Sequence, residues 1–321
     1  MSKPTIYIAR KIPEHLLDPY RNDFVFRMWE KEDEPVPRNK LLKEVKQADG
    51  LLSMLSDAID KELLSHADNL KVTANLAVGF DNIDYSAAKE KGVVVTNTPD
   101  ILTETTADLG FALLMASARR IVEANKYIEA GKWKNWAPYL FAGSDIHHKA
   151  IGIVGMGRIG EAIARRARGF GMTVLYHNRS RKYEAEKKLQ AAYVSLDKLF
   201  SEADFVVSVV PLTNETYEMF DESAFKKMKS TAIFINISRG ATVDEDALFQ
   251  ALKTKQITAA GLDVFAEEPI PKDHPLMTLD NVICLPHIGS ASEETRTAMV
   301  QLCLENIASV LKGGKPKTPV G

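Results

Sequence analysis

The sequence predicts an α/β protein with two doubly wound parallel-sheet domains, and three observations support this. A chain of 321 residues is long enough for two domains. Short apolar strands alternate with helical stretches in residues 1–98 and again in residues 150–288. This alternation favours parallel sheets with helices on both faces. A glycine-rich turn begins almost halfway along the chain, so a segment of domain size precedes it.

The first segment contains short apolar runs bounded by polar and turn residues, which is the pattern of buried strands. The expected strands are Thr5–Ala9, Phe24–Met28, Gly50–Met54, Lys71–Leu76 and Val93–Thr96. The expected helical stretches are Glu14–Tyr20, Asn39–Gln47, Lys61–Ser65 and Tyr85–Lys91. Pro99 ends this run. A long helix is then expected over Glu104–Ala130, capped by Thr103 and stopped by Gly131.

The second segment opens with an apolar strand from Ile151 that runs into a glycine-rich turn. A helix over Glu161–Phe170 and a strand over Met172–Tyr176 are expected next. The further expected strands are Asp204–Val210, Ala232–Ile237, Ala259–Val264 and Val282–Leu285. A last long helix is expected over Glu293–Leu311.

The turn has the pattern G-x-G-x-x-G and lies between a strand and a helix. It comprises Gly155, Met156, Gly157, Arg158, Ile159 and Gly160. In a dinucleotide-binding turn the first glycine allows the sharp bend, the second lets the backbone approach a pyrophosphate, and the third lets the helix pack on the strand. The positive end of the helix then meets the phosphate charge. The sequence therefore predicts a bound dinucleotide.

The residues after the second strand of this unit bear on which dinucleotide binds. An NAD-selective site would carry Asp or Glu here, to bind the ribose hydroxyl. Asn178, Arg179, Ser180 and Arg181 offer hydrogen-bond donors and positive charge instead. We therefore expect NADPH to be preferred over NADH. The alternative is a solvated basic turn, which the absence of the acid weakens.

Composition limits the other partners. A net charge of −2 gives no reason to expect nucleic acid or a membrane surface. Cys284 and Cys303 are expected to be buried, reduced thiols, and a cytoplasmic location follows by default. His147 and His148 lack the spacing of a metal site, so no metal is expected.

Candidate catalytic side chains follow three apolar strands, where ligands bind in doubly wound folds. These are Arg239, Glu268 and His287. A guanidinium can bind a carboxylate, an imidazolium can donate a proton, and a carboxylate can fix the imidazole. Taken singly, each could be a surface, capping or turn residue. The case for catalysis is that all three follow a dinucleotide turn.

Several sequence blocks carry a resemblance to a known family. The blocks are Val78–Asp84, Val154–Gly160, Phe234–Gly240, Gly261–Pro269 and Leu285–Ala291. Through them the chain resembles the D-isomer-specific 2-hydroxyacid dehydrogenases over essentially its whole length. Within the family it is most similar to the glyoxylate/hydroxypyruvate reductases, including the branch also called 2-ketogluconate reductases. Gly143–Lys149 is typical of that branch.

The resemblance implies a role for each matching residue. Arg239 would bind the substrate carboxylate and carbonyl, His287 would be the acid/base, and Glu268 would pair with His287. The backbone amides of Val78 and Gly79 would hold the carboxylate. The implied cofactor contacts are Thr106, Gly155, Gly157, Arg158, Ile159, Gly160, Asn178, Arg179, Ser180, Pro211, Asp263 and Gly289. Among them, Asp263 would bind the nicotinamide amide.

The resemblance also implies the domain plan and the assembly. Residues 1–98 with 289–321 would form a flavodoxin-like substrate domain, and residues 99–288 an inserted Rossmann cofactor domain. A homodimer is implied, built on the cofactor domains around the long helix. The aromatic segment 133–141 would lie near the partner's active site, or would pack within the dimer arm.

The leading hypothesis is therefore an NADPH-preferring reductase of small 2-keto acids, namely glyoxylate, hydroxypyruvate or 2-ketogluconate. Two alternatives stay open. One is a related dehydrogenase acting on phosphoglycerate or phosphite. The other is a non-enzymatic corepressor that senses the cofactor.

Overall fold

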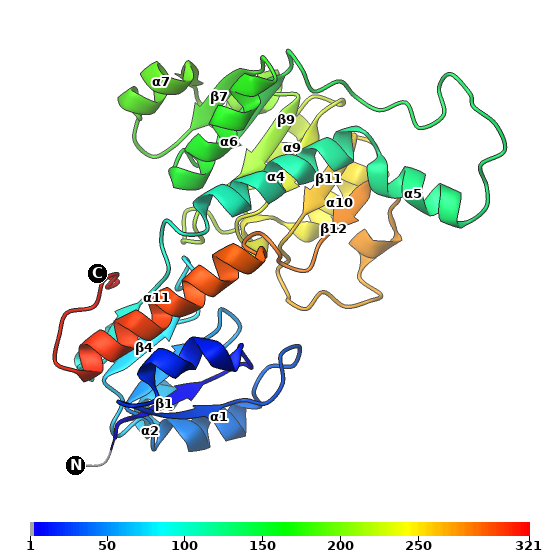
Figure 1. The fold of residues 1–321 in the computed structure, drawn as a ribbon. Helices are drawn as coiled ribbons and strands as arrows, with labels where there is room; N and C mark the ends of the chain where they lie inside the picture. Colours follow the sequence, from blue (N-terminus) through cyan, green and yellow to red (C-terminus); the bar gives the residue numbers. More distant parts are fainter. Residues whose placement is uncertain (1–2) are drawn as a thin grey trace. The chain divides into compact units, whose positions relative to one another are not determined.

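We analysed a computed structural model, which describes residues 3–321. The chain forms two compact units, which we describe separately. Unit 1 is the chain up to Leu102 together with Ala291–Gly321, and unit 2 is Thr103–Ser290. Each unit is built on its own parallel sheet (Figure 1). The predicted fold class, with two parallel α/β sheets, is confirmed.

Unit 1 has a five-stranded sheet in the order β2-β1-β3-β4-β5. The strands are β1 (Thr5–Ile8), β2 (Val25–Met28), β3 (Gly50–Ser53), β4 (Val72–Asn75) and β5 (Val94–Thr96). All neighbours pair in parallel. This strand order is that of flavodoxin-like folds, so the prediction for this sheet is confirmed.

Helices cover both faces of this sheet because successive strand residues point to opposite sides. On one side, Tyr7 and Leu51 pack against α1 (Arg38–Val45), α2 (Lys61–His66) and α3 (Tyr85–Glu90). On the other side lie η1 (Glu14–Tyr20), a 3-10 helix, and α11 (Glu293–Leu311). Figure 1 shows α11 alongside β4. The C-terminal helix therefore completes the unit that the N-terminal residues begin.

Unit 2 has a seven-stranded parallel sheet in the order β12-β11-β10-β9-β6-β7-β8. The strands are β6 (Ala150–Val154), β7 (Thr173–His177), β8 (Ala191–Tyr193), β9 (Phe205–Ser208), β10 (Ile233–Asn236), β11 (Ala259–Leu262) and β12 (Val282–Cys284). The chain reverses direction across the sheet between β6 and β9, and this is the switch point at which Rossmann folds bind dinucleotides.

Two apolar clusters fill the faces of the second sheet. The helices are α4 (Thr103–Ala118), α5 (Ile121–Glu129), α6 (Arg158–Gly169), α7 (Tyr183–Leu189), α8 (Leu196–Glu202), α9 (Glu222–Lys227) and α10 (Glu245–Lys253). On β10, Ile233 and Ile235 face α4 and α6, whereas Phe234 faces α8, α9 and α10. The fold thus holds the carboxyl ends of β10, β11 and β12 in a fixed row.

The prediction of a single long helix over Glu104–Ala130 is wrong. The structure has two helices, α4 and α5, because Arg120 adopts a left-handed conformation with φ 53°. Arg120 is held there by two hydrogen bonds to the Glu123 carboxylate. Thr103 is the first residue of α4 rather than its cap. Figure 1 shows α5 and the segment after it projecting away from the sheet of unit 2.

Two smaller differences concern unit 2. The strand β8 (Ala191–Tyr193) was not predicted, because a three-residue strand carries too little apolar pattern. The helix after the glycine turn begins at Arg158 rather than Glu161, since Gly157 is its N-cap. Across residues 3–321, none of the helices combines the length and the apolar character needed to span a bilayer.

Candidate active site

The glycine turn has the geometry that a bound pyrophosphate requires. Gly155 has φ 104°, and a Cβ there would lie 2.7 Å from the backbone oxygen of Val209. A Cβ on Gly160 would lie 2.2 Å from the backbone oxygen of Gly155, so the helix packs tightly on the turn. A Cβ on Gly157 would meet no atom within 4 Å. The open space beside Gly157, at the N-terminus of α6, fits a phosphate.

Arg158 and Ile159 open α6, directly after this space. At the end of the neighbouring strand β7, Asn178 is half-buried, whereas Arg179 and Ser180 are exposed. Arg181 instead forms an ion pair with Glu186, in which its Nε atom lies 2.7 Å from Oε1. Asn178, Arg179 and Ser180 therefore remain the predicted donors to the cofactor after β7. Pro211 follows β9 on the same edge of the sheet.

Arg239 lies just past the carboxyl end of β10, and its backbone is fixed from two sides. Its carbonyl oxygen accepts hydrogen bonds from Nδ2 of Asn236 at 3.1 Å and Oγ1 of Thr242 at 2.7 Å. A Cβ on the next residue, Gly240, would lie 1.8 Å from the backbone carbon of Phe265. Only glycine allows this close approach, which brings the Arg239 loop against the loop after β11.

Glu268 and His287 form a hydrogen-bonded pair. Oε2 of Glu268 lies 2.7 Å from Nδ1 of His287, and Oε1 accepts the backbone N–H of Phe265 at 3.0 Å. An ionised carboxylate can only accept, so Nδ1 of His287 carries the proton in this pair. The Nε2 atom of His287 is then left to exchange a proton with a ligand.

The charge of Glu268 follows from its neighbours. Burial would raise the pKa of Glu268, but the hydrogen bond and charge of His287 oppose it. The Phe265 N–H and the charge of Arg239 act in the same direction, and the net result is a pKa below the ordinary 4.5. Glu268 is therefore ionised at neutral pH. The charge of Arg239 thus acts on the Glu268 carboxylate that pairs with His287.

Asp263 fixes the loop that carries His287. Asp263 directly follows β11, and only 1% of its surface is exposed. Its two carboxylate oxygens accept the backbone N–H groups of Ile288 and Gly289, each at 2.8 Å. His287 itself has φ 52°, a conformation that side chains other than glycine rarely adopt. The two hydrogen bonds of Asp263 therefore hold the backbone next to His287, which itself has a strained conformation.

Burial raises the pKa of Asp263, although the N–H groups of Ile288 and Gly289 and the charge of His287 partly oppose the rise. Thr106, near the start of α4, completes this cluster. A Cβ on Gly289 would lie 3.2 Å from Oδ2 of Asp263 and 3.3 Å from Cγ2 of Thr106. The structure thus brings together Thr106, Asp263 and Gly289, three of the predicted cofactor contacts.

The predicted substrate contacts Val78 and Gly79 belong to unit 1, in the loop after β4. Both carbonyl oxygens of this pair accept side-chain hydrogen bonds. Nδ2 of Asn97 donates to Val78 at 2.8 Å, and Nδ2 of Asn75 donates to Gly79 at 2.9 Å. The roles of Val78 and Gly79 remain a prediction, but their loop is firmly held.

Sequence reasoning missed the supporting residues of both loops. Asn236 and Thr242 hold Arg239, and Asn75 and Asn97 hold the Val78–Gly79 loop. One signal was available, since Asn75 and Asn236 are polar residues at the ends of buried apolar strands. Such residues need hydrogen-bond partners. Within residues 3–321 the structure contains no group of three or more His, Cys, Asp or Glu side chains that could hold a metal.

Comparisons with known proteins agree with this geometry. The family model of the D-isomer specific 2-hydroxyacid dehydrogenase NAD-binding domain matches residues 111–289. A glyoxylate reductase of Thermococcus onnurineus is 50% identical over 322 residues, which cover 99% of this chain and 96% of the relative. The fold and site thus define an NAD(P)-dependent oxidoreductase.

Solved structures extend the comparison. A crystal structure of a Thermus thermophilus protein matches with a TM-score of 0.93 and 43% identity, over 99% of this chain and 100% of that one. An NADPH-dependent glyoxylate/hydroxypyruvate reductase of Sinorhizobium meliloti, in complex with NADP and malonate, matches with a TM-score of 0.85 and 32% identity. That match covers 100% of this chain and 97% of the other. The chain belongs to the D-isomer-specific 2-hydroxyacid dehydrogenase family.

Proposed function

We propose that this enzyme reduces small 2-keto acids, glyoxylate and hydroxypyruvate first, to D-2-hydroxy acids, with NADPH preferred over NADH. The observation that carries the proposal is the Glu268–His287 pair, 2.7 Å apart, on the same sheet edge as Arg239 and the glycine turn. The names of the relatives from Thermococcus onnurineus and Sinorhizobium meliloti support the choice of substrate. The larger 2-ketogluconate stays within the proposal as a further substrate.

The residues divide the work of the reaction. The bound nicotinamide cofactor supplies the hydride that reaches the keto carbon. His287 donates the Nε2 proton to the carbonyl oxygen, so that one hydride and one proton complete the alcohol. Glu268 stabilises the charged imidazole and orients it. Arg239 binds the substrate carboxylate and carbonyl through its guanidinium. The predicted role of the Val78 and Gly79 backbone amides, as donors to the substrate carboxylate, is part of the proposal.

The NADPH preference is supported by the residues after β7. No Asp or Glu stands at positions 177–182 to repel a 2′-phosphate. Asn178, Arg179 and Ser180 can donate to that phosphate. The complex of the Sinorhizobium meliloti relative with NADP agrees with this choice.

The test is a substrate panel with purified protein, followed by the absorbance of the reduced cofactor. Glyoxylate, hydroxypyruvate and 2-ketogluconate are each measured with NADPH and with NADH. We expect glyoxylate and hydroxypyruvate to be reduced with a higher kcat/KM for NADPH. A higher kcat/KM with NADH would contradict the cofactor proposal alone. Failure to oxidise either cofactor with any of these acids would contradict the reductase and favour a binding role.

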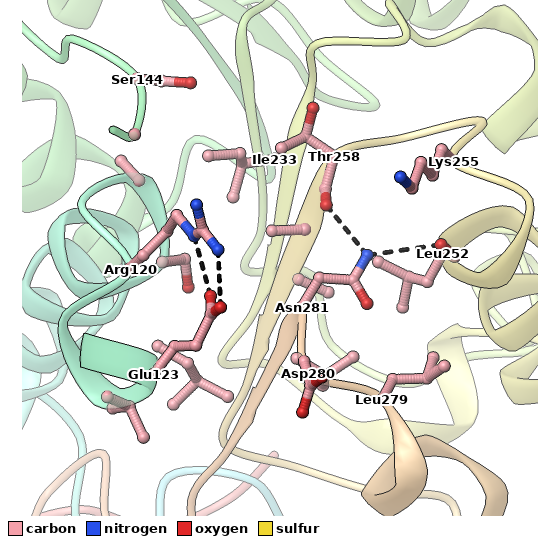
Figure 2. A pocket seen from close by; sticks show the side chains of 18 of the residues that line it. Arg120, Glu123, Ser144, Ile233, Leu252, Lys255, Thr258, Leu279, Asp280 and Asn281 are labelled. Carbon is pink, nitrogen blue, oxygen red and sulfur yellow. Dashed lines mark hydrogen bonds and ion pairs between the residues drawn. The ribbon is translucent and has the colours of Figure 1, made fainter. Parts of the chain in front are cut away.

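We also propose a homodimer built on unit 2. Large apolar side chains of α5 and the following segment are exposed in the single chain, including Ile128 at 59%, Trp136 at 75% and Tyr139 at 86%. A hollow of about 810 Å³ lies between α5 and the amino ends of β10, β11 and β12, lined on one side by Arg120 and Glu123 (Figure 2). Exposed apolar surface of this extent is typical of a protein interface.

Light scattering after size exclusion tests the dimer. The wild-type chain is expected at twice the mass of one chain. The double variant Trp136→Ser with Tyr139→Ser is expected to shift toward the monomer, because it removes apolar surface that only the assembly would bury. A wild-type monomer at all concentrations would contradict the proposal.

A further inference from the structure

In the loop after β4, three consecutive backbone carbonyl oxygens each accept a hydrogen bond from a donor within unit 1. The oxygen of Ala77 accepts the backbone N–H of Thr98 at 2.9 Å. The oxygens of Val78 and Gly79 accept Nδ2 of Asn97 at 2.8 Å and Nδ2 of Asn75 at 2.9 Å. The carbonyl side of this loop is therefore fully engaged with its own unit.

The direction of the carbonyl groups sets the direction of the N–H groups. A trans peptide is planar, and its N–H points opposite to its C=O. Thr98 thus turns the N–H of Val78 away from β5, and Asn97 turns the N–H of Gly79 away from its own side chain. Within the described residues 3–321, neither the Val78 N–H nor the Gly79 N–H donates a hydrogen bond. Both donors are thus left for a ligand.

Asn97 and Asn75 are themselves held in place. Asn75 is the last residue of β4 and is fully buried, and its Oδ1 accepts from Oγ of Ser53 at 3.1 Å. Asn97 follows β5, the strand next to β4. The Asn75 side chain therefore cannot leave the loop without losing its bond to Ser53.

The C-terminal segment supports Asn97 further. The carbonyl oxygen of Asn97 accepts Oγ1 of Thr318 at 2.6 Å. Oγ1 of Thr318 in turn accepts Nδ2 of Asn306 at 2.8 Å, from a fully buried position on α11. A chain of hydrogen bonds therefore runs from α11 through Thr318 and Asn97 to Val78.

We propose that Asn97 is a positioning residue that sets the Gly79 amide to bind the substrate carboxylate, beside the Val78 amide that Thr98 orients. Asn97 does not touch the substrate; it acts through the peptide between Val78 and Gly79. This inference rests on the proposed function, because it presumes that a 2-keto acid carboxylate binds these amides. The inference adds to the proposed function the residue that fixes the Gly79 amide before the substrate arrives.

The test compares Asn97→Ala and Asn97→Asp with wild type. Alanine removes the donor without adding charge, and aspartate keeps the shape but places an acceptor against the Val78 oxygen. We expect the KM for glyoxylate to rise about tenfold while kcat changes less than about threefold, because ground-state carboxylate binding is lost. The dissociation constant for NADPH, measured by fluorescence, should be unchanged, because the glycine turn lies in unit 2.

Trp29→Phe is the matched control. The indole N–H of Trp29 donates to the backbone oxygen of Glu34 at 2.9 Å, next to β2, which β1 and β3 separate from β4. Trp29→Phe removes this bond, which is similar in kind but far from the loop of Val78 and Gly79. The variant should therefore leave the KM for glyoxylate unchanged. An unchanged KM in both Asn97 variants would overturn the inference, as would a parallel loss of NADPH affinity. A wild-type enzyme that leaves glyoxylate unreduced would instead overturn the proposed function.

Discussion

The loop that carries His287 and the loop of Val78 and Gly79 are held by opposite chemistry. In unit 2, the Asp263 carboxylate accepts the backbone N–H groups of Ile288 and Gly289. In unit 1, the amides of Asn97 and Asn75 donate to backbone carbonyls. An acceptor turns N–H groups inward, whereas a donor turns them outward. The first arrangement presents a side chain to the ligand, and the second presents backbone donors that suit a carboxylate.

The two arrangements also differ in charge. Asp263 and Glu268 titrate, and their environments move their pKa values in opposite directions. Asn75 and Asn97 do not titrate. The function of the loop with His287 should therefore depend on pH, and that of the loop we propose to bind the carboxylate should not. Each prediction below tests one side of this difference, in order of falling effect.

His287→Ala removes the proton donor and should have the largest effect. We expect kcat with glyoxylate to fall about 10²- to 10⁴-fold, with a much smaller change in KM. This is the reverse of the pattern expected for Asn97→Ala. Steady-state kinetics measures both, and near-normal turnover in His287→Ala would remove the catalytic role of this side chain.

Asp263→Asn should damage both the stability of unit 2 and turnover. Asparagine keeps one acceptor oxygen but sets an NH2 group against a backbone N–H, so one buried donor loses its partner. We expect the free energy of unfolding to fall by about 1–3 kcal/mol. We expect kcat to fall about tenfold or more, because the imidazole is less well placed. Denaturant unfolding and kinetics provide the measurements.

Asp204→Asn is the control for this prediction. Oδ2 of Asp204 accepts the backbone N–H of Ala150 at 2.9 Å, at the amino end of β6. Like Asp263 it accepts a backbone N–H, while its other oxygen pairs with Lys229 at 3.0 Å, and it lies at the opposite edge of the sheet from His287. This variant should lose stability and keep kcat. Equal losses of kcat in both variants would show that Asp263 has no particular effect on His287.

Acid should weaken unit 2 through Glu268. Because folding lowers the pKa of Glu268, its contribution to stability is complete above its ordinary pKa of 4.5 and is lost as pH falls through the lowered value. Asp263 has a raised pKa and contributes in the opposite sense, since protonation removes the cost of burying its charge. Glu268→Gln should flatten the fall of Tm in acid, and Asn97→Ala should not. An identical acid profile in Glu268→Gln and wild type would refute this assignment.

Thr318→Val should have the smallest effect. Valine matches the shape of threonine but removes the hydrogen bond to the Asn97 oxygen. The loop of Val78 and Gly79, which Asn97 holds, is then loosened indirectly. We expect the KM for glyoxylate to rise about two- to threefold and stability to fall by about 1 kcal/mol. Kinetics and denaturant unfolding measure the two effects. A KM rise larger than that of Asn97→Ala would mean that the C-terminal segment acts by another route.

Local pattern was enough to predict most strands and the glycine turn. Apolar runs bounded by Gly, Pro and polar residues predicted the strand into Gly155, the bounds Glu293–Leu311 of α11, and every parallel strand of both sheets except β8. The break at Arg120 was not, because the helical pattern continues through it without Gly or Pro. A left-handed arginine bound to Glu123 has no sequence signature.

The sequence by itself predicted the family and the fold class, which are confirmed, and singled out Arg239, Glu268 and His287 as candidate catalytic residues. It could do so because those residues follow strands whose carboxyl ends must share one edge of a parallel sheet. Only the tertiary structure decided how the loops are held. The bonds from Asp263 to Gly289 and from Thr318 to Asn97 join residues far apart in the chain. Their partners are set by how the strands and helices pack, which no local pattern encodes.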